Sequence, residues 1–454
     1  MLAAIRRAYI RRKRPLHLGK FPMERIRRVP VPTTKINGDE VPRVPERSNF
    51  FFRSGHGDLG PKPQEGVKRF VNKYPMSQAV RDILFNQVPL QDGEVAPEQA
   101  PIPDDLEERA KHFKSLCYVL DADIVGICEA PEYVWYSHDK TGKPIDARHK
   151  YAIVILSDQG YETSAAASGD DWISGLLSMR AYHKGSNVSC SVAEYIRKLG
   201  YEAKAHTSAS SEVLQLPLVL LAGLGEMSRI GEVVLNPFLG PRFKVSVVTT
   251  NLPMAVDQPI DFGLQDYCSK CMKCAKECPP AAISFGDKVM FNGYELWKPD
   301  VEACTRYRVT NPHGSSCGRC LKVCPFNKPN VLHHRFGLWL AVNVPASHRF
   351  LIWFDDLMEY GNRNWAWKWW WDLETVDGKV TQPKKTNDRQ LRPDRNIPTR
   401  QKITLYPPET LPAPDFQGVW PVREHHTTMQ VTHEKTLAPE VMKIKEQAAN
   451  ATDG

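Results

Sequence analysis

The chain has 454 residues, a formal net charge of +8 and 42% hydrophobic residues. This length is enough for two or three domains with packed cores, and it excludes a small electron carrier. No apolar stretch reaches the roughly 20 residues that a membrane-spanning helix needs. The longest candidate, 213–225, is too short and contains Pro217.

A basic, Pro-rich extension is expected over residues 1–104, with one short helix at 76–87. Its stretch 5–28 is dense in Arg and Lys. Such a stretch can contact nucleic acid or an anionic surface, but a solvated or domain-wrapping extension explains it more simply. No apolar segment follows the arginines, as an export signal requires, so a cytoplasmic location is expected. The clustered spacing of the cysteines agrees with that location.

The second segment, 105–261, follows a linker at 93–105 and alternates helical and strand patterns. Helices are expected at 104–120, 170–200 and 212–223, with a break near Gly185 left open. Strands are expected at 121–130, 150–157, 201–205 and 242–250. This alternation predicts an α/β sandwich.

Cysteines at iron–sulfur spacing mark the third segment, 262–330. The first run has the C-x2-C-x2-C-x3-C-P spacing in Cys268, Cys271, Cys274, Cys278 and Pro279. In that spacing three thiolates hold one cluster and the fourth reaches a second cluster. The second run consists of Cys317, Cys320, Cys324 and Pro325, with Cys304 upstream as its first member. Eight thiolates predict two [4Fe–4S] clusters.

Exchange of the fourth ligands assigns the thiolates to the two clusters. One cluster takes Cys268, Cys271, Cys274 and Cys324, and the other takes Cys304, Cys317, Cys320 and Cys278. Structural zinc also accepts four thiolates, but this spacing suits zinc poorly. The three other cysteines lie in apolar or helical stretches and are expected to be packed thiols: Cys117, Cys128 and Cys190.

Two further features leave alternatives open. The loop between Cys304 and Cys317 carries Arg306, Tyr307, Arg308 and His313, and it either lines a site or only covers a cluster. The last segment, 331–454, is aromatic-rich and then polar. Its tryptophans at 365, 367, 369, 370 and 371 are a candidate wall for an apolar pocket. A run this dense cannot all face one side of a helix, so some must lie at the surface.

No nucleotide fingerprint accounts for the second segment. The stretch GLGEMSRIG at 223–231 resembles G-x-G-x-x-G only superficially, because it follows a helix and not a strand. No D-x-H-x-x-G is present, so nothing marks a corrinoid held through a histidine. Spacing alone therefore predicts an iron–sulfur redox protein with a cofactor or substrate domain.

The stretch LPLVLLAGLGEMSRIG, followed by GPRFK and then by the two cysteine runs, resembles the corrinoid-dependent reductive dehalogenases. The resemblance covers about 105–330. Epoxyqueuosine reductases share the plan of a cobamide and two clusters, but the GPRFK strand and the aromatic tail fit the dehalogenases better. The resemblance implies a nitroreductase-like sandwich that buries a base-off cobamide, followed by a ferredoxin-like module with two clusters.

In that family the clusters reduce cobalt to Co(I), which attacks or binds the halogen of an organohalide. A tyrosine then donates the proton that replaces the halide, and a nearby Arg or Lys stabilises the phenolate. Carried onto this chain, the donor is Tyr182 and the cationic partners are Arg242 and Lys244, which share one face of a strand. The simpler alternatives are a core tyrosine, a turn-capping arginine and a solvated lysine.

The resemblance is to the cytoplasmic, catabolic type of the family. It implies an organohalide substrate, in particular a halogenated aromatic, with no membrane partner. The chain ends before a fused reductase would follow, so a separate ferredoxin or flavin reductase is expected to dock on its basic surface. Two other functions stay open: an electron-transfer subunit with clusters but no cobalt, and an enzyme of the epoxyqueuosine-reductase kind whose basic arm contacts tRNA.

Overall fold

The structure, a computed structural model, describes residues 14–392 and 395–432. A four-stranded sheet lies at its centre in the order β2-β3-β7-β4. The strands are β2 (Ile124–Glu129), β3 (Tyr151–Asp158), β7 (Phe243–Thr250) and β4 (Ala203–His206). All four lie where the sequence predicts strands. Every pairing in the sheet is antiparallel. Long connections join the neighbouring strands, and the fold as a whole is mixed helix and strand.

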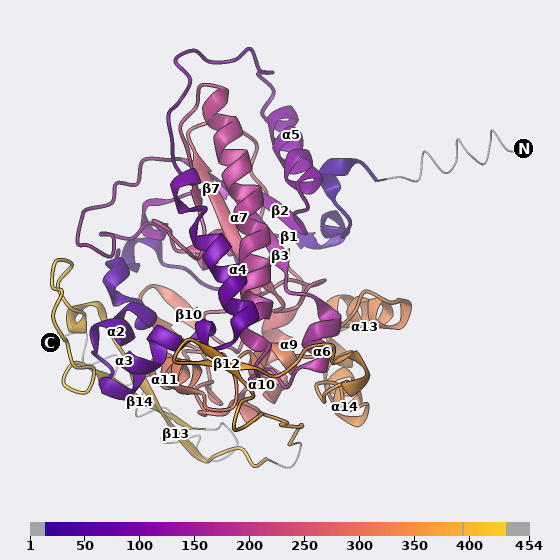
Figure 1. The fold of residues 1–454 in the computed structure, drawn as a ribbon. Helices are drawn as coiled ribbons and strands as arrows, with labels where there is room; N and C mark the ends of the chain where they lie inside the picture. Colours follow the sequence, from indigo (N-terminus) through magenta and orange to yellow (C-terminus); the bar gives the residue numbers. More distant parts are fainter. Residues whose placement is uncertain (1–13, 393–394, 433–454) are drawn as a thin grey trace, which may run out of the picture.

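Two helices cover one face of the sheet (Figure 1). α5 (Leu106–Val119) begins at Asp105, whose side chain accepts hydrogen bonds from the next turn, as the acidic start predicts. α7 (Ser174–Lys198) packs along β7 and β3. Buried residues of both helices join Ile153 and Val248 in one core.

α7 is continuous through Gly185, where the sequence left a break open. The glycine lets the helix approach the sheet closely, because a Cβ there would lie 2.9 Å from Ser246 Oγ and 3.2 Å from Ser157 Oγ. The helix ends before Gly200, whose φ of +82° favours glycine. The glycine inside the helix therefore serves packing, and the one after it serves termination.

The other face of the sheet packs against α8 (Gln215–Leu221) and the cysteine segment. That segment contains α9 (Leu264–Lys270), α10 (Lys273–Lys276), β9 (Val289–Phe291), β10 (Tyr294–Leu296), α11 (Val301–Thr310) and α12 (Arg319–Lys322). Two short strands, β5 (Glu226–Met227) and β6 (Val234–Leu235), precede it. Cys128 lies in this core and Cys117 and Cys190 lie in the opposite one, so all three are packed thiols as expected.

The N-terminal segment wraps around the body. β1 (Arg27–Arg28) pairs with β8 (Ile260–Asp261), and Arg27 forms an ion pair with Asp261. Three helices follow: α2 (Phe50–His56), α3 (Pro61–Arg69) and α4 (Pro75–Phe85), the last at its expected place. α4 packs against α7, and α3 packs against α11. The basic stretch 5–28 lies in the described structure only from Arg14 onward.

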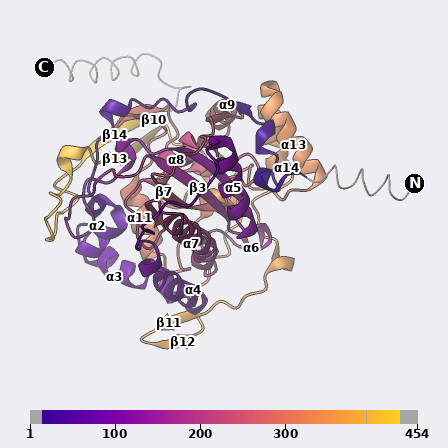
Figure 2. The same ribbon diagram turned by 90° about the horizontal axis from the view of Figure 1, so that it is seen from above.

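The C-terminal segment starts with α13 (Leu332–Asn343) and α14 (His348–Leu357), which stand out at one side in both views (Figure 2). Two hairpins follow, β11 (Glu374–Val376) with β12 (Lys379–Thr381) and β13 (Arg400–Leu405) with β14 (Thr427–Thr432). The chain then returns to the N-terminal helices, where Val422 donates to the carbonyl of Asp58. None of the described helices is both long and apolar enough to cross a membrane.

The tryptophan run is divided between exposed and buried positions in the described structure. A short 3-10 turn, Trp365–Trp367, is followed by extended chain, in which successive side chains point to opposite sides. Only Trp370 is buried, at 4% exposed, whereas Trp369 and Trp371 on either side of it are exposed. Trp365 and Trp367 are exposed as well. The expectation of surface tryptophans is therefore confirmed, whereas the pocket hypothesis stays a prediction.

Candidate active site and thiol groups

The first group of thiols combines the first cysteine run with the end of the second. Cys268 lies in α9, Cys271 ends that helix, Cys274 lies in α10, and Cys324 follows α12. Burial raises the pKa of the Cys274 thiol, and the thiols of Cys271, Cys268 and Cys324 raise it further. These four side chains therefore lie around one another.

The second group combines the last cysteine of the first run with three residues of the second. Burial, together with the thiols of Cys278 and Cys304, raises the pKa of the Cys320 thiol to about 12. Cys317 lies beside Cys320 and Cys304. Burial and Asp170 raise the pKa of the Cys317 thiol most, and Cys320 and Cys304 also raise it. Cys304 lies in α11, a helix capped by the side chain of Asp300.

The thiols of both groups are held close together inside the protein. Six of the eight thiols belong to residues that keep part of their surface accessible, although the surrounding protein raises the pKa of the thiols. Among the described residues, no three His, Cys, Asp or Glu side chains converge on a position for a single metal ion. A cubane instead distributes four thiolates over four irons. The two groups have the memberships that the exchange of fourth ligands predicts, and their occupancy is taken up under the proposed function.

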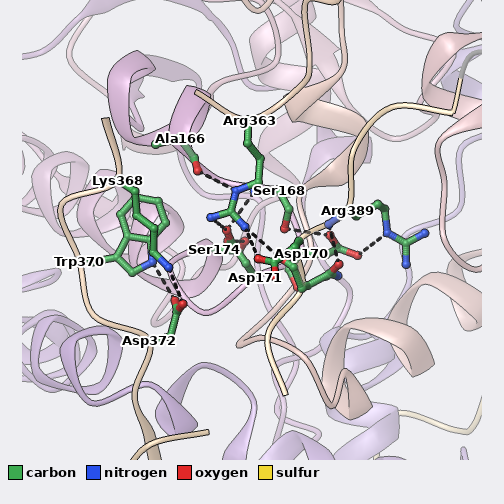
Figure 3. Close-up of polar contacts among 12 residues, drawn as sticks. Ala166, Ser168, Asp170, Asp171, Ser174, Arg363, Lys368, Trp370, Asp372 and Arg389 are labelled. Carbon is green, nitrogen blue, oxygen red and sulfur yellow. Dashed lines mark hydrogen bonds and ion pairs between the residues drawn. The ribbon is translucent and has the colours of Figure 1, made fainter. Parts of the chain in front are cut away.

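A buried polar cluster joins the start of α7 to the C-terminal segment (Figure 3). Asp171 accepts hydrogen bonds from the backbone of Ser168 at 2.9 Å and from Ser174 Oγ at 3.0 Å. The guanidinium of Arg363 lies 3.6 Å away and also donates to the carbonyl of Ala166, the last residue of α6 (Tyr161–Ala166). Burial raises the pKa of Asp171 to about 6, against the effect of Arg363.

The neighbouring carboxylate connects this cluster to the second thiol group. Asp170 accepts a hydrogen bond from the hydroxyl of Tyr307 at 2.7 Å and lies 3.4 Å from Arg389. It also raises the pKa of the Cys317 thiol, so it lies beside the second group. Tyr307 from the segment 304–317 and Arg389 from the C-terminal segment thus meet at the carboxylate of Asp170. Through Asp170, the cluster connects the second thiol group to the segment that leads into α7.

Tyr182 and Lys244 face each other between α7 and β7. The ammonium of Lys244 lies 5.2 Å from the centre of the Tyr182 ring. Ser157, opposite Lys244 in the strand register, is buried and its hydroxyl has no hydrogen-bond partner. Within the described chain, neither the Tyr182 hydroxyl nor the Lys244 ammonium has a hydrogen-bond or ion-pair partner. Three polar groups without protein partners therefore meet at this point of the sheet.

Arg242 occupies a different environment. It is 4% exposed, and its Nε donates to Asp158 at 2.8 Å while its Nη1 donates to Asn327 at 2.6 Å. Its guanidinium lies 5.3 Å from the ring of Tyr161, not from that of Tyr182. The strand β7 begins one residue later, so the alternation that would set Arg242 and Lys244 on one face does not extend to Arg242. The structure brings only Lys244 to Tyr182.

Arg308 is a further candidate that the sequence left open as part of the loop after Cys304. The structure places it in α11, with its guanidinium 4.8 Å from the ring of Phe51 and 5.5 Å from that of Phe70. Its Nε is buried without a hydrogen-bond partner. Phe70 packs against the same small apolar cluster as Tyr182. Only the fold could reveal this arrangement, because the four residues come from four separate parts of the chain.

A surface hollow lies at the opposite end of the sheet. It measures about 550 Å³ and is lined by residues that include Arg43, His149 and Asn251. Asn251 follows the last residue of β7, whereas Lys244 lies near its first residue. Lys244 and Asn251 are seven positions apart, which along a strand is roughly 23 Å. The candidate site is thus identified by side-chain chemistry and not by this hollow.

Comparison with known families supports the interpretation of the cysteine segment. The family described as a 4Fe-4S dicluster domain matches residues 267–328. That range contains all eight cysteines of the two thiol groups. It does not include Tyr182 or Lys244, so it bears only on the thiol groups.

Curated relatives match somewhat less than half of the chain. The tetrachloroethene reductive dehalogenase of Sulfurospirillum multivorans is 32% identical over 197 residues, which are 42% of this chain and 37% of that protein. A tetrachloroethene reductive dehalogenase of Desulfitobacterium hafniense is 33% identical over 45% of this chain and 38% of its own length. The epoxyqueuosine reductase of Shewanella oneidensis is 26% identical over 42% of this chain. This chain therefore spans about two fifths of the length of the first two proteins.

Solved structures extend the likeness to nearly the whole chain. The catabolic reductive dehalogenase NpRdhA, in complex with 3-bromo-4-hydroxybenzoic acid, is 49% identical, with a TM-score of 0.88. The match covers 91% of this chain and 61% of NpRdhA. A structure whose description concerns a mechanism for B12-dependent dehalogenation is also 49% identical, with a TM-score of 0.89. The likeness thus includes the N-terminal and C-terminal segments that the sequence resemblance left out.

Proposed function

Because this chain belongs to the reductive dehalogenase family, we propose that it replaces a halogen of an organohalide by hydrogen. The observation that carries the proposal is the pairing of Tyr182 with Lys244, both without other protein partners, in a chain that also holds two groups of four thiols. A proton donor and a path for electrons are the two things that such a reaction needs. The net change consumes two electrons and one proton, and it releases one halide ion.

The two thiol groups are proposed to hold two [4Fe–4S] clusters, with Cys268, Cys271, Cys274 and Cys324 on one and Cys278, Cys304, Cys317 and Cys320 on the other. Four mutually close thiols in each group, with no other ligand type among them, fit that group. The second group lies beside Asp170 and Arg308, and is therefore proposed to stand between the first group and Tyr182. Electrons would pass from the first cluster to the second.

A cobamide is proposed as the second cofactor, because the solved relative with a TM-score of 0.89 is described as B12-dependent. When bound, it supplies a reduced cobalt that takes up the halogen. The unpartnered polar groups of Tyr182, Lys244 and Ser157 fit a site that receives a polar guest. The finer fold description, a nitroreductase-like sandwich followed by a ferredoxin-like module, is part of this proposal.

Tyr182 is the proposed proton donor. Its hydroxyl proton goes to the carbon that loses the halogen, which leaves a phenolate. The ammonium of Lys244, 5.2 Å from the ring centre, stabilises that negative charge. Arg242 is proposed to act indirectly: by holding Asp158 and Asn327 it fixes the start of β7, and thus the position of Lys244.

The substrate is proposed to be a halogenated aromatic that carries a negative charge. The relative NpRdhA is described in complex with 3-bromo-4-hydroxybenzoic acid. In this chain the rings of Phe51 and Phe70 provide apolar surface, and Arg308 between them provides a cation with a buried, unpartnered Nε. An aromatic ring with an anionic group matches both features.

The remaining parts of the proposal concern partners and organisation. The electron donor is proposed to be a separate ferredoxin or flavin reductase, and the protein is proposed to work in the cytoplasm without a membrane or nucleic-acid partner. The proposed division of the chain is 1–104, 105–261, 262–330 and 331–454. These segments interlock, since Arg363 donates to Ala166 at the end of α6 and Gln401 donates to Ala281 in the cysteine segment. They are therefore not expected to fold separately.

The test compares two tyrosines that each lie beside a cation. We expect Tyr182→Phe to abolish release of bromide from 3-bromo-4-hydroxybenzoic acid, because the ring remains but the proton is lost. Tyr161→Phe, next to Arg242, is expected to retain activity. Halide release is measured anaerobically with cobamide-supplemented protein and a chemical reductant, and iron and cobalt contents are compared between the variants. Full activity of Tyr182→Phe with unchanged metal content would remove Tyr182 from the mechanism.

A further inference from the structure

Arg229 is a buried cation beside the first thiol group. It lies in the stretch GLGEMSRIG, between β5 and β6, and is 4% exposed. Its guanidinium donates only to backbone carbonyl oxygens, namely those of Cys268 at 2.8 Å, Ser284 at 3.0 Å, Gly286 at 3.0 Å and Ser269 at 3.4 Å. No described carboxylate lies within ion-pair distance of it, and Asp287 acts on it only from farther away. The charge is therefore buried without a counter-ion from the protein.

A buried guanidinium without a counter-ion is costly. It remains protonated in proteins, so burial cannot neutralise it, and the carbonyl dipoles offset only part of the lost hydration. The face of Trp297, 4.8 Å away and 3% exposed, adds a weaker attraction. Burial lowers the pKa of Arg229, whereas the thiols of Cys274, Cys268 and Cys271 raise it. Asp287 raises it less than these thiols do, so the first thiol group is the main source of negative charge around Arg229.

We propose that Arg229 is the fixed counter-charge of the cluster held by Cys268, Cys271, Cys274 and Cys324, and that it raises the reduction potential of that cluster. The inference rests on the proposed function in one respect, the presence of that cluster. Four thiolates make a cubane anionic, and each reduction adds one negative charge. A buried cation at close range stabilises the reduced form more than the oxidised form.

A second, partly exposed arginine lies beside the other thiol group. Arg395 donates to the carbonyl of Lys276 at 2.6 Å and to that of Cys278 at 3.2 Å. Burial raises the pKa of the Cys278 thiol to about 11, and Arg395 acts against that rise. Each group of thiols thus has one arginine on the carbonyl of a ligand residue. This pair supplies a matched control, because each arginine is expected to act on its own cluster.

The experiment measures the two midpoint potentials of anaerobically reconstituted protein by redox titration followed with electron paramagnetic resonance. We expect Arg229→Gln to shift one of the two potentials to a more negative value. Arg395→Gln is expected to shift the other. Arg229→Lys keeps the charge but loses the forked geometry, so its potential is expected to stay closer to that of the unchanged protein. Thermal unfolding and iron content are recorded for every variant.

The outcomes separate the tuning role from a purely structural one. If Arg229→Lys and Arg229→Gln lose similar thermal stability but only the Gln variant shifts a potential, charge is the cause. If the potentials are unchanged in Arg229→Gln at full iron content, or if both arginine variants shift the same potential equally, the inference is wrong. If the unchanged protein binds no iron, the proposed function fails instead, and the two failures are distinguishable.

Discussion

At the scale of single residues, the main result is that two neighbouring cations have different environments. Lys244 lies over the Tyr182 ring and has no described partner, whereas Arg242 is engaged by Asp158 and Asn327. The sequence could nominate both, because both lie near the start of one strand. It could not distinguish them, since the distinction depends on Asp158 and Asn327, which are distant along the chain.

This difference predicts that substitution of Lys244 mainly lowers activity and that substitution of Arg242 mainly lowers stability. Lys244→Met is expected to lower kcat for dehalogenation by roughly tenfold to a hundredfold, which corresponds to the loss of about 1.5–3 kcal/mol of interaction with a charged group. Arg242→Met is expected to lower the free energy of unfolding by roughly 1–3 kcal/mol, because it breaks a partly buried ion pair. Steady-state kinetics and urea unfolding of both variants check this. A larger loss of kcat in Arg242→Met than in Lys244→Met would reverse the assignment.

At the scale of helices and strands, the close approach of α7 to the sheet positions Tyr182. Gly185 makes that approach possible, one turn after the tyrosine. In the sequence the same glycine was only a candidate break. Its role depends on Ser157 and Ser246, which the sequence does not place opposite it. The individual elements could be predicted from their patterns, and their contacts could not.

Two helical glycines provide a matched test of this packing. Gly185→Ala is expected to lower the free energy of unfolding by roughly 1–3 kcal/mol, because the added Cβ would lie 2.9 Å from Ser246 Oγ. Gly337→Ala in α13 is expected to raise it by up to about 1 kcal/mol, since nothing lies within 4 Å and alanine favours helix. Urea unfolding at one temperature checks both. Equal effects of the two substitutions would contradict the packing argument.

At the scale of the whole molecule, both ends of the described chain return to the core. β1 pairs with β8, and the C-terminal segment carries Arg363 and Arg389 to the cluster beside the second thiol group (Figure 3). The cysteine spacing was sufficient to predict which thiols lie together, because each run supplies neighbouring ligands to one cluster and its last cysteine to the other. The wrapping of the polar tail was not predictable, because it depends on contacts of Arg363 and Arg389 with residues far away in the chain.

The central claim is that one chain combines two iron–sulfur clusters with a cobamide. The most direct test is the metal content of anaerobically purified, cobamide-supplemented protein. Two cubanes predict about eight irons per chain, and the cobamide predicts about one cobalt. Iron at this level without cobalt would contradict the dehalogenase proposal and favour an electron-transfer subunit. The absence of iron would contradict the assignment of the eight thiols as well.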